Sequence, residues 1–591
     1  MRKFAILFSV TVAVLAGCKG GSSGPEQQSA KGGVKYGGVF RINEEEDFRN
    51  LFPLKVNEIV SQRIANQVYE GLIDFNQKDL SLVPGLAESW TVNDSATVFT
   101  FKLRHGVYFQ DDACFPDGKG REMKAEDVKY CFTRLCTSDP MNAGFWVFRD
   151  RVVGANEYYQ STVEGKPLAD GVKGVKVMDD YTLEVDLLHP YSSFLNILAM
   201  PFTWVFPKEA FEKYGVEMRV KCVGTGPFKV KEVKDGETVI LSKNENYWGV
   251  DKFGNKLPYL DAIQFTFVKE KKSEFLEFKK QNLDMVFRLP VEMIDDILDE
   301  LENAKGNLAY DLQITPAMSN QYYGFLQTDK VFSDVRVRKA FNYAIDRKKI
   351  INYTLRGEGI PGNHGFVPPS FRRTSGDFKG YDAEAVKGYD YNPDEAKRLL
   401  ADAGYPNGKG FPRVTLQLNS GGARNIQVAE VIQNMLSENL GISVEMNVMP
   451  FAQHLENVES AKTTFWRGGW VSDYPDPDSF LNLFYGAHVP ASLEEKSYIN
   501  TFRFKNAAYD SLFAAAMSET NEVKRFDLYR QCDQMVMDNA VVMMIYYDEN
   551  YRLLQHYVRN FPINPIEYRK FNEVYFDKSA EGANQAAAEK K

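Results

Sequence analysis

A strand, a helix and a second strand follow one another between residues 414 and 448, and this order constrains the fold more than any other stretch. The segments VTLQLNS and ISVEMNV both alternate apolar and polar side chains, which is typical of strands. Apolar residues share one face of the helix expected at 424–440: Val428, Val431, Ile432 and Met435. A strand, a helix and a strand in this order predict two parallel strands with a right-handed crossover, so this lobe is expected to be α/β.

Helix signals also occur upstream of this unit. Asn392 is expected to cap a helix that has Pro393 in its first turn and Gly404 as its C-cap. The stretch from residue 333, SDVRVRKAFNYAIDRKKII, predicts one continuous helix, because positions 337, 341, 344 and 345 share an apolar face.

The first third of the chain predicts a different kind of lobe. The segment GGVFRI suggests an early strand, and a helix is expected at 57–70. TVFTFKLR and YTLEVDL alternate as strands do, whereas MKAEDVKYCFTRL has helical spacing. Together the last three segments predict a small α+β lobe.

The N-terminus predicts export. Arg2 and Lys3 precede an apolar run that ends in Leu-Ala-Gly-Cys at Cys18, and this run is shorter than the roughly 20 residues that span a bilayer. The pattern resembles a bacterial lipoprotein signal peptide, which implies cleavage before Cys18 and a lipid anchor on that cysteine. An ordinary secretory signal is the alternative. Residues 18–35 are expected to form a flexible tether, because Gly, Ser, Gln and Pro bury little surface.

The net charge and the cysteine content indicate which binding partners and which disulfides can be expected. The formal net charge is -9 with both signs interspersed, so the basic stripe that nucleic acid requires is missing and no such partner is expected. Five cysteines follow Cys18, an odd number that does not suggest a disulfide framework. At most one long-range disulfide is expected among them: Cys114, Cys131, Cys136, Cys222 and Cys532.

The usual catalytic and metal motifs are missing. The sequence has no G-x-x-x-x-G-K-[ST] phosphate loop, no H-E-x-x-H and no C-x-x-C, and its histidines are far apart. A G-x-S-x-G match at 20–24 lies in the expected tether, without the strand and helix that a nucleophile elbow needs. Asp473, Asp476 and Asp478 lack the spacing of an EF-hand calcium loop. No metal, cofactor or catalytic residue is therefore predicted, although a carboxylate pair brought together by the fold stays open.

Nine segments follow one another between residues 69 and 412: YEGLIDF, LVPGLAESW, FTFKLRHGVYF, MKAEDVKYCFTRL, GTGPFKV, LSKNENYWG, LPYLDAIQF, DVRVRKAFNYAIDRKKII and DEAKRLLADAGYPNGKGFP. Each segment alone is weak evidence. Together and in this order they resemble the extracytoplasmic solute-binding proteins of ABC transporters that include oligopeptide-, dipeptide- and nickel-binding proteins.

The resemblance implies a fold and its division. The expected fold is α/β, a periplasmic binding protein type II-like two-lobed clamp with an additional inserted α+β domain and a two-strand hinge. The expected boundaries are 1–17 for the signal peptide, 18–35 for the tether, 36–75, 201–318 and 546–578 for lobe I, 76–200 for domain II, 319–545 for lobe III and 579–591 for a disordered tail. The hinge strands are expected near 319–327 and 541–549.

The resemblance also implies a binding site in the stretch WRGGWVSDYPDPDSF. Asp473 follows Trp470 by three residues, as does the aspartate that pairs with the peptide α-ammonium in oligopeptide-binding members. Arg467 matches a position where such proteins bind the carboxylate of a short peptide. Gly468, Gly469 and Val471 are expected to offer backbone groups to the ligand, as in strand addition.

Further ligand contacts are expected on the facing wall and among aromatic side chains: Asn57, Glu58, Ile59, Phe145, Trp146, Tyr322, Tyr323 and Trp470. Structural roles are the alternatives: a place in the core for the aromatic residues, a turn ahead of Pro475 for Asp473, and a surface or structural role for Arg467. Some family members carry cysteine at the position of Val471, so a disulfide found in those members is not expected here.

The function implied is capture of peptides between two closing lobes and delivery to ABC permease subunits with their ATPases. The protein is expected to be a monomer without cofactors, lipid-anchored to a bacterial membrane and facing the periplasm or cell exterior. Three alternatives stay open: the same fold binding a nickel chelate or oligosaccharide, an exported hydrolase, and a binder that works without an importer.

Overall fold

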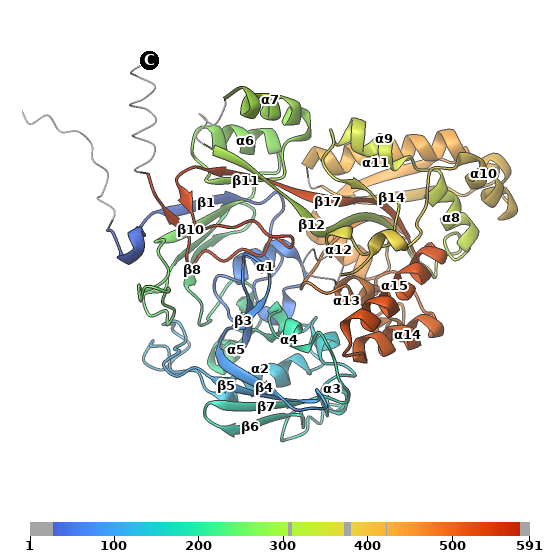
Figure 1. Cartoon of the computed structure of the whole chain (residues 1–591). Helices are drawn as coiled ribbons and strands as arrows, with labels where there is room; N and C mark the ends of the chain where they lie inside the picture. Colours follow the sequence, from blue (N-terminus) through green and yellow to red (C-terminus); the bar gives the residue numbers. More distant parts are fainter. Residues whose placement is uncertain (1–27, 305–309, 372–379, 421, 579–591) are drawn as a thin grey trace, which may run out of the picture.

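The structure is a computed structural model that describes residues 28–304, 310–371, 380–420 and 422–578. The expected signal peptide, Cys18 and the expected tail at 579–591 lie outside these residues. Three main sheets organise the chain, and Figure 1 shows them as a lower body, an upper left body and a body on the right.

The first sheet is built from segments far apart in the sequence. Its order is β1-β10-β9-β8, and β1 pairs in parallel with β10 although more than 200 residues separate them. Its strands are β1 (Val39–Asn43), β8 (Phe228–Lys234), β9 (Thr238–Lys243) and β10 (Ala262–Thr266). The early strand expected from GGVFRI is thereby confirmed.

Part of the expected tether packs onto this first body. Ser29 and Lys35 form a β-bridge, and Asn255 bonds both backbone groups of Lys31. Val34 is buried against Tyr259 and its neighbours. The expectation of a flexible tether is therefore wrong for residues 28–35, because the apolar side chain of Val34 packs against Tyr259, which is distant in the sequence.

The second sheet forms the small α+β domain at the bottom of Figure 1. Its order is β4-β5-β7-β6, antiparallel throughout. Its strands are β4 (Ala87–Val92), β5 (Val98–Leu103), β6 (Val175–Asp179) and β7 (Thr182–Asp186). Helix α2 (Ala125–Leu135) packs on it through Val128, Phe132 and Leu135, so the strands and helix predicted here are confirmed.

The third sheet has the order β11-β17-β12-β16-β14-β15, with β13 (Ile360–Pro361) also pairing with β17. Its other strands are β11 (Met285–Phe287), β12 (Tyr310–Phe325), β14 (Val414–Asn419), β15 (Val444–Met449), β16 (Phe465–Val471) and β17 (Val542–Gln555). Strands β14 and β15 run parallel on either side of α11 (Gly422–Leu440) in the sequence, which confirms the strand–helix–strand prediction.

Two helix predictions are wrong in length. Helix α1 is only Ile59–Ala65, because the next backbone groups bond elsewhere: Phe228 N–H donates to the Gln67 carbonyl at 3.0 Å, and Gly226 N–H to that of Val68 at 2.9 Å. The helix expected from 333 breaks into α8 (Val335–Tyr343) and α9 (Arg347–Lys349), which continues as a π-turn over Ile350–Thr354.

The break after α8 has a tertiary cause. The buried Arg347 guanidinium donates to the carbonyls of Asn342, Tyr389 and Met544, and this draws it out of helical register. Asp346 then starts the new helix by accepting from Lys349 N–H at 3.0 Å. Helix α10 (Pro393–Asp402) has the predicted Asn392 cap, and Gly404 takes φ +100° just after its cap residue.

The two longest strands cross between the upper left and right bodies (Figure 1). β12 and β17 pair antiparallel, but their register shifts between Pro316 and Asn320 and again at Gln321. The hinge predicted near 319–327 and 541–549 falls on these strands. Other helices are α3 (Ala155–Val163), α4 (Phe194–Ile197), α5 (Lys208–Tyr214), α6 (Lys271–Lys279), α7 (Ile294–Ala304), α12 (Phe451–Glu459), α13 (Asp478–Leu481), α14 (Ala507–Ser518) and α15 (Glu522–Asp538).

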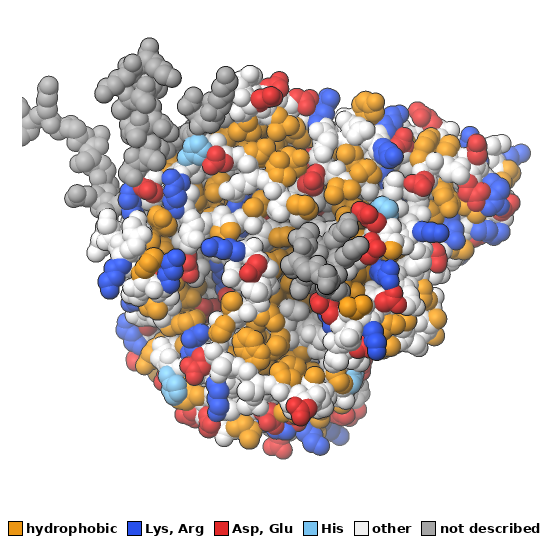
Figure 2. Space-filling model, viewed as in Figure 1, with side chains coloured by type: hydrophobic (Ala, Val, Ile, Leu, Met, Phe, Trp, Pro, Cys, Tyr) orange, Lys and Arg blue, Asp and Glu red, His pale blue; other side chains and the backbone are white. Residues whose placement is uncertain are grey.

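The surface is of mixed charge. On the face shown in Figure 2, Lys and Arg side chains alternate with Asp and Glu over all three bodies. Within the described residues, no helix is both long and apolar enough to cross a bilayer.

Candidate functional site

A cavity of about 260 Å³ lies where the three bodies meet. One wall comes from residues 56–59, a second from the α+β domain through Trp146, and a third from β16 with the loop that follows it. Its lining includes most of the residues predicted from sequence: Asn57, Glu58, Ile59, Trp146, Tyr322, Arg467, Gly468, Gly469, Trp470, Val471 and Asp473.

Asp473 sits in the loop after β16, with its backbone N–H bonded to the Ser479 hydroxyl at 3.0 Å. No described residue forms a hydrogen bond or ion pair with its carboxylate, which lines the cavity. Burial raises the pKa of Asp473 to about 7, because removing the charged form from water is unfavourable. The carboxylate is thus an acceptor without a partner, which suits an incoming cation.

Arg467 lies six residues earlier on β16, so an extended chain puts the two Cα atoms at most about 20 Å apart. Its guanidinium donates to two side-chain amide oxygens, that of Asn419 at 3.2 Å and that of Gln321. Among the described residues no carboxylate forms an ion pair with it. The positive charge is therefore oriented but not neutralised.

Strand β16 presents one unpaired edge to this cavity. Leu326 N–H bonds the Thr464 carbonyl and Ser472 N–H bonds the Met318 carbonyl, so the even-numbered residues of this stretch direct their backbone groups toward β12. The odd-numbered residues then face the opposite edge. On that edge β14 pairs only with Phe465 and Trp466. The backbone groups of Gly469 and Val471 that face this edge form no hydrogen bond with another described residue.

The two glycines of β16 therefore differ in role. The backbone of Gly468 belongs to the β12 ladder, and a Cβ there would lie 2.5 Å from the Tyr322 ring. Gly469 is exposed and offers its backbone to the cavity edge. All three residues predicted to offer backbone contacts line the cavity, but only Gly469 and Val471 lie on the unpaired edge of β16, whereas the backbone of Gly468 pairs with β12.

The facing wall carries charges that are already engaged. Glu58 caps α1 by accepting from Val60 N–H at 2.7 Å and Ser61 N–H at 2.9 Å, and burial raises its pKa. Asn57 donates to Glu459 at 3.1 Å, and Arg49 bonds the same oxygen at 2.9 Å. Ile59 contributes an apolar surface.

The predicted aromatic residues divide into two groups. Trp146, Tyr322 and Trp470 line the cavity, and both indole N–H groups are buried without a partner among the described residues. Phe145 lies outside it, stacked on Tyr159 with ring centres 3.9 Å apart. Tyr323 is also outside, packed on Phe465 in the core of the right-hand body.

Sequence reasoning missed several lining residues, among them Glu459, Arg288, Gln321 and His454. His454 is neutral because burial and Arg467 lower its pKa to about 3. Its Nδ1 lies 3.0 Å from the Gln417 amide nitrogen, so its Nε2 carries the proton and donates to the Arg467 carbonyl at 3.0 Å. These residues carry no local motif, since their partners lie far away in the sequence.

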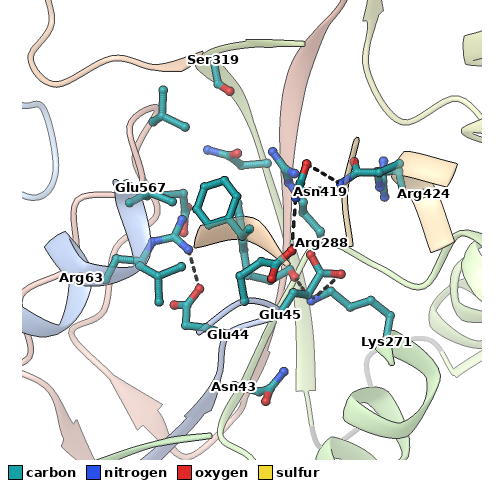
Figure 3. A pocket seen from close by; sticks show the side chains of 18 of the residues that line it. Asn43, Glu44, Glu45, Arg63, Lys271, Arg288, Ser319, Asn419, Arg424 and Glu567 are labelled. Carbon is teal, nitrogen blue, oxygen red and sulfur yellow. Dashed lines mark hydrogen bonds and ion pairs between the residues drawn. The ribbon is translucent and has the colours of Figure 1, made fainter. Parts of the chain in front are cut away.

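A second cavity of about 150 Å³ adjoins the first and shares Ile59, Arg288, Phe451, Arg467 and Val471 with it. Figure 3 shows it with Asn419 and Arg424 above and with Glu44, Glu45 and Lys271 below. Most of its charges are paired: Glu44 with Arg63 at 2.7 Å, for example, and Arg424 with Glu358 at 2.5 Å.

The described residues contain no group of three metal ligands, and the five cysteines within them are free thiols. The site can bind a ligand, because the Asp473 carboxylate, the oriented Arg467 guanidinium and the unpaired edge of β16 lie around one cavity.

Two lobes joined by a pair of long strands, with a cavity between them and an inserted α+β domain, define a clamp-type solute-binding protein. The family model described as bacterial extracellular solute-binding proteins, family 5 Middle, matches residues 81–490, and the chain belongs to this family.

Known relatives are similar over nearly their whole length. The chain is 27% identical to the dipeptide-binding protein DppE of Bacillus subtilis over 94% of this chain and 95% of that protein. It is 26% identical to the periplasmic oligopeptide-binding protein OppA of Escherichia coli, over 87% and 88%. The structure of DppA from Helicobacter pylori in complex with peptide STSA matches with a TM-score of 0.77 at 23% identity, over 92% of this chain and 99% of that chain, which supports the fold.

Proposed function

We propose that this protein captures short peptides between its lobes and delivers them to the permease of an ABC importer, without chemical turnover. The observation that carries the proposal is the pair Asp473 and Arg467, opposite charges that flank the open edge of β16 and have no ion-pair partner among the described residues. A peptide has the matching parts: an ammonium, an extended backbone and a carboxylate. The names of the relatives DppE and OppA agree with this class of ligand.

Each end of such a peptide has a partner. A buried ammonium requires a compensating carboxylate, because desolvation without one costs several kcal/mol. Asp473 supplies that carboxylate, and the Arg467 guanidinium matches the planar geometry of the peptide carboxylate. Because the two Cα atoms are at most about 20 Å apart, an extended peptide held at both ends by these residues is limited to about six residues.

The walls between the two charges favour apolar side chains. Aromatic and aliphatic groups line most of this part: Val56, Ile59, Trp146, Phe202, Tyr322, Leu455, Trp470, Leu483 and Ile499. We expect peptides with apolar side chains to bind more tightly than otherwise equal peptides with acidic ones, because each apolar side chain buried contributes about 25 cal/mol per Å².

Calorimetry with tri- to penta-alanine tests the proposal. The free peptides should bind, whereas N-acetylation should weaken binding by removing the charge that Asp473 contacts. Chromatography of the mixture after incubation should return intact peptide. Failure of every free peptide to bind would contradict peptide capture, and appearance of cleavage products would favour the hydrolase alternative.

The anchor is a separate part of the proposal. The lipoprotein-like sequence at Leu15–Cys18 supports attachment of a monomer to a bacterial membrane through Cys18, facing the permease. Cys18→Ser should move the protein from the membrane fraction to the soluble fraction. Acyl chains that persist on the Cys18→Ser protein, detected by mass spectrometry, would contradict this assignment.

A further inference from the structure

Two buried amides connect Arg467 to two carboxylates, Asp548 and Glu46. Gln321 accepts from the guanidinium through its Oε1 and donates through its Nε2 to Asp548 at 2.7 Å. Asn419 accepts from Arg467 at 3.2 Å through its Oδ1 and donates through its Nδ2 to Glu46, also at 3.2 Å. Each amide therefore turns its oxygen to the cation and its NH₂ to an anion.

This orientation follows from the charges. A guanidinium only donates and a carboxylate only accepts, so neither amide can be reversed without two unfavourable contacts. Both side chains are buried, Asn419 at 4% and Gln321 at 5% exposure, and their positions are further held by neighbours. Asn425 donates to the Asn419 oxygen at 3.4 Å, and Asp548 also accepts from Ser319.

We propose that Gln321 and Asn419 are positioning residues that orient Arg467 while keeping it out of an internal ion pair, so that its charge is reserved for the carboxylate of the ligand. This rests on the proposed peptide-binding function. A neutral oxygen fixes a guanidinium without cancelling its charge, whereas a carboxylate at the same place would form a bidentate pair that the ligand must displace. Asp548 is instead paired with Arg288 at 3.2 Å.

The hydrogen bond from Asn419 to Glu46 also joins the two sides of the second cavity. Glu46 follows β1 in the first body, whereas Asn419 ends β14 and Arg467 lies on β16 in the other. Closure thus brings Asn419 to Glu46 and completes the set of contacts around the guanidinium. Burial raises the pKa of Glu46, which further limits its competition for Arg467.

The test replaces each amide by the isosteric acid and compares two forms of one ligand. Wild type, Asn419→Asp and Gln321→Glu are titrated by calorimetry with tri- to penta-alanine as free acids and as C-terminal amides. Wild type should prefer the free acid at least tenfold. In both variants the affinity for the acid should fall about tenfold or more, to the level of the amide form, while affinity for the amide form changes little.

Two controls separate this role from loss of structure or from added charge. Asn457→Asp makes the same substitution on α12, where Asn457 bonds Gln417 and does not touch Arg467, and should keep the preference for the acid. Arg467→Met should itself abolish the preference for the acid, and in that background Asn419→Asp should cause no further change in the acid-to-amide ratio.

The outcomes distinguish the two proposals. If wild type binds none of the peptides, peptide capture itself fails and the positioning role fails with it. If wild type prefers acids but Asn419→Asp and Gln321→Glu keep that preference, the positioning role is overturned and peptide capture stands. A further change caused by Asn419→Asp in the Arg467→Met background would also overturn the role, because the effect would not pass through Arg467.

Discussion

The proposed pairing of Asp473 with the peptide ammonium predicts that binding depends on pH. Its pKa of about 7 in the closed, ligand-free structure means that below this pH a proton must leave before an ammonium can pair with it. Affinity for a zwitterionic peptide should therefore fall by up to about tenfold per pH unit below 7 and level off above it. Calorimetry between pH 5 and 7.5 measures this, and Asp473→Asn should bind weakly with no such slope.

The same group acts on stability with the opposite sign. The carboxyl ionises near its ordinary pKa of 3.8 in the unfolded chain but only near 7 in the folded protein, so the unfolded state binds fewer protons between these values. Asp473 thus opposes folding increasingly as pH rises from about 4 to 7. Asp473→Asn should melt at a higher temperature than wild type at pH 7 and at the same temperature near pH 3, and equal melting at both would contradict the raised pKa.

Alanine substitutions at the adjacent residues Gly468 and Gly469 should have different effects on stability and on binding. An alanine Cβ at position 468 would lie 2.5 Å from the Tyr322 ring, which is held in the core, so Gly468→Ala should destabilise the protein by about 1–3 kcal/mol. At 469 the nearest atom, at 2.8 Å, is the end of the Gln321 side chain. Gly469→Ala should unfold close to wild type in urea but bind peptide more weakly. Equal loss of stability in both variants would contradict the division of roles.

At the scale of elements, α12 links the two lobes through its last residue. Glu459 is buried and bonds Arg49 and Asn57 of the opposite body, contacts that exist only when the lobes are together. Glu459→Gln should weaken peptide affinity by roughly 1–2 kcal/mol, because it removes a charge-assisted bond from the closed state alone.

The matched control is Glu456→Gln, one turn earlier on the same helix. Glu456 pairs with Lys496 of its own lobe at 2.5 Å and is partly exposed, so its loss should leave affinity within about twofold of wild type. Calorimetry with the same peptide compares the two variants. Equal effects would show that Glu459 does not stabilise closure.

At the scale of the whole molecule, we propose that the hinge lies where β12 and β17 lose register. The shifts at Pro316 to Gln321 leave the strands paired on either side, with Asp548 bonded to Ser319, Gln321 and Arg288 at the break. The lobes can therefore rotate about this point while each half of the sheet stays intact. Small-angle X-ray scattering should show a smaller radius of gyration on addition of peptide.

Peptide should also protect the protein against unfolding. At a free concentration of 100 times Kd, a ligand that binds only the folded state stabilises it by about 2.7 kcal/mol. Melting temperatures measured with free tri-alanine and with N-acetylated tri-alanine compare the stabilisation that each peptide gives. A scattering curve that peptide leaves unchanged, together with an unchanged melting temperature, would contradict closure on the ligand.

Features that depend on neighbours in the chain could be predicted from the amino-acid sequence. The strand–helix–strand unit, α2 and the Asn392 cap were predictable, because periodicity and capping act over a few residues. So was the presence of both Asp473 and Arg467 on the wall of one cavity, through the resemblance of their motif.

Tertiary structure decided the rest. The break after α8 depends on carbonyls up to 200 residues from Arg347, and the end of α1 depends on Gly226 and Phe228. Successive side chains of β12 point to opposite faces of the sheet, so Tyr322 lines the cavity and Tyr323 lies outside it. The amides beside Arg467 belong to separate strands, so only the folded sheet brings neutral oxygens to that guanidinium, and no local pattern encodes this.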